Sequence, residues 1–145
     1  KGSSFFDQLI DLYATHGFFK ERLISITKKG KSGAQEIQKI MDEARTSPPL
    51  EINGSSVIKI EDYQSSISYD ATTNTSSAIS IPKANVLIFA TDDGSRIALR
   101  PSGTEPKIKY YISVNKALKV ASEFESTESE LEVKINKILK AMNLE

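Results

Sequence analysis

The sequence contains no cysteine, and its only histidine is His16. Without cysteine the chain can form neither a disulfide bond nor a thiolate zinc site, and it has no cysteine nucleophile. With one histidine, we expect neither a histidine-based catalytic triad nor a cluster of histidine metal ligands. The lack of cysteine also fits a cytoplasmic location, which we expect for this protein.

An excess of either charge is also missing, because 19 basic residues balance 19 acidic ones. Broad, non-specific nucleic-acid binding usually shows as a basic excess, so we expect no nucleic-acid partner. No stretch approaches the ~20 apolar residues of a membrane-spanning helix, and residues 1–4 lack the apolar core of a signal peptide. We therefore expect no membrane partner. The chain starts at Lys1 rather than at methionine, so we expect it to be an internal piece of a longer protein.

The length of 145 residues suits one compact domain together with a linking helix. Apolar residues recur at helical spacing over Ser4–Thr15, and Gly17 can end that helix. We therefore expect residues 1–17 to be a linking helix and residues 18–145 to be the domain proper.

The rest of the chain predicts an α+β fold, an antiparallel sheet with helices on one face. Two Ser/Thr-x-x-Glu/Gln patterns, Ser32 with Gln35 and Thr127 with Glu130, predict capping boxes that open helices. Asn53-Gly54 predicts a tight turn, and the polar stretch Gln64–Ser80 predicts a solvated hairpin or loop. The predicted strands are Phe18–Thr27, Val57–Ile60, Val86–Ala90, Ser95–Leu99 and Ile108–Val114.

The chemistry lies in Arg100–Lys107, which reads Arg-Pro-Ser-Gly-Thr-Glu-Pro-Lys and is predicted to form a loop between two strands. Arg100 has a planar guanidinium group whose parallel N–H donors can bind two phosphate oxygens. Ser102 and Thr104 have hydroxyl groups that can donate hydrogen bonds. Gly103 allows an anion to approach the backbone closely. Taken alone, Ser-Gly-Thr is also a common turn, and Arg100 could simply pair with Glu105 or another surface carboxylate.

The complete octet resembles the phosphate-binding loop in the C-terminal domain of the α-D-phosphohexomutases, the phosphoglucomutase and phosphomannomutase family. Its neighbourhood is similar too, and the resemblance covers nearly the whole chain, least well over Gln64–Ser80. The similar segments are Tyr13–Phe19, Lys31–Gly33 with Ile40-Met41, Pro82–Leu87, Asp93–Arg96 and Ile108–Ile112. The resemblance implies the TATA-binding-protein-like fold of that domain.

The resemblance also implies a function. These isomerases move a phosphoryl group between positions 1 and 6 of glucose or mannose, using a phosphoserine and Mg²⁺ held by other domains. Their fourth domain binds the phosphate that is not reacting. Carried over, the substrate phosphate site is Arg100, Ser102, Gly103, Thr104 and Lys109. Lys107 is a weaker candidate, Glu105 is expected to brace the loop, and Lys109 could instead be a solvated lysine on a strand face.

Three parts of such an enzyme have no counterpart in this sequence: a phosphoserine loop, an Asp-x-Asp-x-Asp magnesium loop and a sugar-specificity loop. Asp92-Asp93 is better explained by a hairpin turn than by a metal site. We therefore expect no catalytic residue, metal or bound cofactor in this chain, and no mutase activity from it alone. The expected partners are a hexose phosphate and the three other domains. A free-standing module that binds a phosphorylated ligand, or a structural cap with a vestigial loop, are the alternatives.

Overall fold

The computed structural model describes residues 18–116 and 121–144. The predicted linking helix and its boundary at Gly17 lie outside the described residues. The chain divides into two compact units, one of Lys1–Arg22 with Ser113–Glu145 and one of Leu23–Ile112. The candidate site lies entirely within the second unit.

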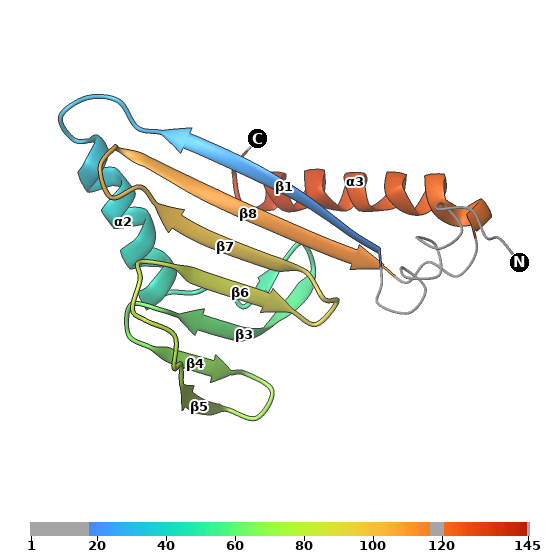
Figure 1. The fold of residues 1–145 in the computed structure, drawn as a ribbon, viewed down its shortest axis with the longest axis horizontal. Helices are drawn as coiled ribbons and strands as arrows, with labels where there is room; N and C mark the ends of the chain where they lie inside the picture. The colour runs from blue at the N-terminus through green and yellow to red at the C-terminus, as the bar shows by residue number, and fades with distance from the viewer. Residues whose placement is uncertain (1–17, 117–120, 145) are drawn as a thin grey trace, which may run out of the picture. The chain divides into compact units, whose positions relative to one another are not determined.

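An eight-stranded sheet carries the fold (Figure 1). Its strand order is β1-β8-β7-β6-β3-β4-β5, with the short β2 paired to β3. The registered pairs β2–β3, β3–β4, β3–β6, β4–β5 and β6–β7 are all antiparallel. The strands are β1 (Phe18–Thr27), β2 (Glu51–Ile52), β3 (Ser55–Asp62), β4 (Ile67–Asp70), β5 (Thr75–Ala78), β6 (Leu87–Thr91), β7 (Arg96–Pro101) and β8 (Lys107–Lys116). Together with the two α-helices of the described ranges, this sheet confirms the predicted α+β class.

The predicted turns are present. Asn53 and Gly54 have φ values of 51° and 79°, the left-handed pair that a two-residue hairpin of this twist requires. The polar stretch Gln64–Ser80 forms a hairpin of β4 and β5, and every residue of β5 is exposed. Solvent exposure explains why this segment has no apolar periodicity.

The helix α2 (Gly33–Thr46) confirms the predicted second helix and buries Ile37 and Met41 within the Leu23–Ile112 unit. The capping box predicted at Ser32 and Gln35 is wrong. The Ser32 hydroxyl donates to the Glu36 carboxylate at 3.3 Å and makes no side-chain cap with the backbone. Ser32 has φ −88° and ψ 0° rather than the extended backbone that is typical of an N-cap residue.

The helix α3 (Phe124–Ala141) belongs to the other unit and buries Leu131, Ile135, Ile138 and Leu139, as its spacing predicts. Arg22 of β1 donates to the Asn136 side chain at 2.9 Å. Lys20 lies 3.4 Å from the Glu132 carboxylate, which ties the start of β1 to α3.

The capping box predicted at Thr127 is also wrong. A 3₁₀ turn, η1 (Ala121–Glu123), runs directly into α3, so Thr127 is a helical residue that is only 3% exposed. Stacking between Phe124 and Phe18, with ring centroids 5.0 Å apart, supports this earlier start. Neither helix in the described ranges has the length and apolar content needed to cross a membrane.

Candidate functional site: an anion-binding loop between β7 and β8

The loop between β7 and β8 is shorter than the sequence suggests. Arg100 and Pro101 are the last residues of β7, so the connection comprises only residues 102–106. It is closed by the Ser102 N–H, which donates to the Lys107 carbonyl at 2.8 Å. The Lys107 N–H donates in turn to the Glu105 carbonyl at 2.8 Å. Arg100 therefore projects from a sheet strand and not from a loop, which limits its freedom.

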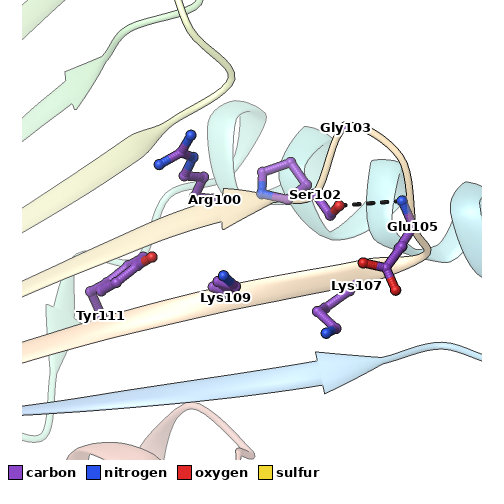
Figure 2. Close-up of a pocket in the computed structure, with 8 residues that line it drawn as sticks. Arg100, Ser102, Gly103, Glu105, Lys107, Lys109 and Tyr111 are labelled. Carbon is purple, nitrogen blue, oxygen red and sulfur yellow. Dashed lines mark hydrogen bonds between the residues drawn. The ribbon is translucent and has the colours of Figure 1, made fainter.

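Ser102 organises the turn from within. Its hydroxyl oxygen accepts the Thr104 N–H at 3.3 Å and the Glu105 N–H at 3.2 Å, the second of which is drawn in Figure 2. These bonds occupy the oxygen as an acceptor, so its proton remains available for donation to a ligand.

Gly103 leaves the top of the loop open. Its N–H makes no hydrogen bond within the described part of the chain, and a Cβ there would meet nothing within 4 Å. An anion can therefore come close to this N–H group.

Three cationic side chains lie beside the loop on the exposed face of β7 and β8. They are Arg100, Lys107 and Lys109, as Figure 2 shows. They line a cavity of about 280 Å³ together with Ser102, Gly103, Pro101, Glu105 and Tyr111. The size is close to the lower end of ordinary small-molecule sites.

The two strands place like charges beside each other. Counting outward from the closing pair, Ser102 and Lys107, along antiparallel strands puts Arg100 opposite Lys109. Like charges in such cross-strand positions are destabilising unless an anion lies between them. A bound anion between the two side chains would offset this cost.

None of the three cations makes an ion pair within the described ranges. Arg100 does not pair with Glu105, although that carboxylate lines the same cavity. By contrast, Arg96 on the same strand lies 3.1 Å from the Glu61 carboxylate. The alternative that Arg100 serves only as a surface ion pair is therefore not supported by the geometry.

The side chains of β8 alternate between two faces of the sheet. Ile108, Tyr110 and Ile112 are buried, whereas Lys107, Lys109 and Tyr111 are on the opposite face. Burial raises the pKa of the Tyr110 phenol above its ordinary value of 10.0, so that group stays neutral at physiological pH. Lys107 and Lys109 thus carry their positive charge on the face that bears the cavity.

The structure brings together four of the five predicted site residues: Arg100, Ser102, Gly103 and Lys109. Thr104 is exposed at the loop tip, and its side chain does not line the cavity. Lys107 lines the cavity although the sequence made it a weaker candidate. Tyr111, 41% exposed, also lines it and was missed. The period-two spacing from Lys107 through Lys109 to Tyr111 was the available signal for both.

The residues present do not form a magnesium site. The described ranges contain no group of three or more Asp, Glu, His or Cys side chains able to hold a metal ion. Asp93 is engaged in its turn, where its carboxylate accepts the Ser55 hydroxyl at 3.0 Å and the Ser95 N–H at 3.2 Å.

Comparison with known proteins is consistent with this geometry. The model of the phosphoglucomutase/phosphomannomutase C-terminal domain matches residues 25–131. The chain is 45% identical over 113 residues to a phosphoglucomutase of Staphylococcus aureus, and 41% identical to one of Staphylococcus saprophyticus. In both comparisons the match covers 78% of this chain and 20% of the relative, so the chain spans about a fifth of their length.

A solved structure shows the same fold. Parafusin, the exocytosis-sensitive phosphoprotein and phosphoglucomutase of Paramecium, aligns in its open form with a TM-score of 0.53 and 18% identity. The alignment covers 97% of this chain and 23% of parafusin. The matched family model covers most of the chain, including all eight residues from Arg100 to Lys107. This chain therefore belongs to the phosphoglucomutase/phosphomannomutase family, as a C-terminal domain of that family.

Proposed function

We propose that this domain binds the non-reacting phosphate of a hexose phosphate while phosphoryl transfer takes place elsewhere in a longer mutase. The observation that carries the proposal is the set of three cations around one open loop, none of them paired with a carboxylate in the described ranges. A phosphate dianion would satisfy all three at once.

Each side chain has a distinct part in the proposed binding. Arg100 presents two parallel N–H donors to two phosphate oxygens, while Lys109 and Lys107 act as point charges. Ser102 donates its hydroxyl proton, and Gly103 donates its backbone N–H. Thr104 remains a proposed hydroxyl donor for a ligand that extends over the loop tip.

The wider activity belongs to the proposed full-length isomerase. It would transfer a phosphoryl group between positions 1 and 6 of glucose or mannose, with Mg²⁺ and the phosphoryl donor supplied by its three other domains. This domain would contribute by position, since a grip on the distant phosphate aligns the reacting end of the sugar. A cytoplasmic location stays a prediction.

Titration of the chain with glucose 1-phosphate, followed by amide chemical shifts, tests the proposed binding. We expect shifts to cluster at residues 100–111 and to saturate with a dissociation constant on the order of millimolar, or ~4 kcal/mol, because the sugar contacts of the other domains are missing. Glucose without phosphate is the control and should cause no comparable shifts. Shifts of similar size with glucose, or shifts centred away from β7 and β8, would contradict the assignment.

The chain by itself should have no mutase activity. Its sequence lacks a recognisable phosphoserine loop and magnesium loop, and positioning alone supplies no phosphoryl donor. An assay with glucose 1-phosphate, Mg²⁺ and a hexose bisphosphate activator is expected to show only background turnover. A rate in the usual enzyme range of ~1–10³ s⁻¹ would show that catalytic groups are present here after all.

A further inference from the structure

Gly33, the first residue of α2, lies where no side chain fits. A Cβ added there would come within 2.2 Å of the Lys28 carbonyl oxygen and 3.0 Å of the Pro106 Cβ atom. Its backbone is not in the left-handed region, unlike that of Gly30 or Gly54. The absence of a side chain at Gly33 therefore serves close packing and not an unusual backbone conformation.

The segment from Lys28 to Gly33 contacts the anion-binding loop in two ways. The Lys28 N–H donates to the Pro106 carbonyl at 2.8 Å, and Gly33 lies against the Pro106 ring. Within this segment, the Gly33 N–H donates to the Gly30 carbonyl at 3.2 Å, which holds the turn together. One compact turn thus supports the loop through a backbone hydrogen bond and through contact with a rigid proline.

Pro106 is well placed to transmit a displacement to the cavity. It directly precedes Lys107, whose side chain lines the cavity and whose carbonyl accepts the Ser102 N–H. A shift of Pro106 therefore changes the closing pair of the hairpin, and with it the positions of Ser102 and the three cations.

We propose that Lys28–Gly33 is a brace for the anion-binding loop and that Gly33 is a positioning residue for phosphate, a role that rests on the proposed function. The brace holds the loop in its binding shape before the ligand arrives. Binding then spends less free energy on ordering the loop. Gly33 itself touches no ligand and acts through Pro106.

Replacement of Gly33 by alanine tests the brace. The new methyl group meets a backbone carbonyl, so the backbone at Lys28 or Pro106 has to move. In the free protein we expect altered amide shifts at Ser102, Gly103 and Lys107. Titration with inorganic phosphate should then show an affinity about tenfold weaker than that of the wild type, measured where both proteins are fully folded.

Gly54→Ala is the matched control. Substitution of Gly54 also destabilises the protein, because its φ is 79°. However, nothing lies within 4 Å of a Cβ at this position, and the turn that contains Gly54 joins β2 to β3. The control should lower the free energy of unfolding while leaving phosphate affinity unchanged. If Gly33 has a purely structural role, both variants should show a lower free energy of unfolding and an unchanged phosphate affinity. Equal phosphate affinities of Gly33→Ala and wild type would therefore contradict the proposed brace.

The wild-type chain provides a second test that does not depend on the variant folding. Because Lys28 donates to Pro106, its amide should shift during the phosphate titration with the same saturation curve as Gly103. A Lys28 amide that stays silent while Gly103 shifts would overturn the brace alone. If no residue from 100 to 111 responds to phosphate, the proposed function fails, and the binding role of the brace fails with it.

Discussion

Replacing Arg100 by alanine is expected to remove most of the phosphate affinity of this chain without unfolding it. The guanidinium can make two charge-assisted hydrogen bonds to phosphate, each worth ~1.5–3 kcal/mol. Together these two bonds are comparable to the ~4 kcal/mol expected for millimolar binding. The Arg100 side chain is exposed near the end of β7 and has no hydrogen-bond or ion-pair partner in the described ranges, so its loss removes no contact from the core.

Arg96→Ala is the matched control for this prediction. Arg96 lies on the same strand and carries the same charge, but it pairs with Glu61 and does not line the cavity. Phosphate titration by amide shifts should find Arg96→Ala close to wild type and Arg100→Ala nearly unresponsive. Arg100→Lys should recover only part of the phosphate affinity, because the lysine ammonium is a point charge and lacks the paired N–H donors of a guanidinium group. Equal binding by Arg96→Ala and Arg100→Ala would reject Arg100 as the main ligand.

In a full-length mutase the same change should lower kcat/KM by ~10²-fold or more. Under the proposed function, binding of the distant phosphate aligns the reacting end of the sugar. Loss of the Arg100 contact to that phosphate therefore reduces transition-state binding as well as substrate binding. A rise in KM with an unchanged kcat would instead mean that the grip binds substrate and transition state equally well.

The substitution Phe89→Ala is expected to lower the free energy of unfolding by ~3–5 kcal/mol. Phe89 is 1% exposed in β6 and stands opposite Ile97 of β7, which is itself fully buried. Removing the ring leaves a cavity that a paired strand cannot close. A chain of this length has a total stability of roughly 7–20 kcal/mol, so the loss is a large share of it.

Urea denaturation of wild type, Phe89→Ala and Phe19→Ala checks this expectation. The two variants undergo the same chemical change, but Phe19 is 52% exposed on β1. We expect a clearly smaller loss for Phe19→Ala, because half of its ring already contacts water. Similar midpoints and slopes for the two variants would show that Phe89 is not a core residue.

Much of this domain could be predicted from sequence because its signals are local. The aromatic and branched residues of Phe18–Thr27 predicted a strand with the bounds that β1 has in the structure. Asn53-Gly54 predicted its turn because few other residue pairs tolerate a positive φ at both positions. The eight residues from Arg100 to Lys107 indicated the candidate site, because their types suit phosphate and their sequence resembles a loop of one protein family.

The capping boxes failed because two residue types at the right spacing do not fix the backbone at a helix start. A serine or threonine followed three residues later by Glu or Gln identifies a possible helix start, but the backbone angles and the packing at that point decide whether it is used. Ser32 has helical rather than extended backbone angles, and the stack of Phe124 on Phe18 accompanied an earlier start of α3. Thr127 consequently became a buried helical residue.

The composition of the site was likewise decided by tertiary structure. Sequence determined which residues could bind an anion, because charge and hydroxyl groups are properties of the side chains themselves. The pairing of β7 with β8 then selected Lys107, Lys109 and Tyr111 for the cavity face and left Thr104 at the loop tip. Pattern alone could not identify Gly33, since the need for its missing side chain arises only where Lys28 and Pro106, 78 residues apart in the chain, are brought together by folding.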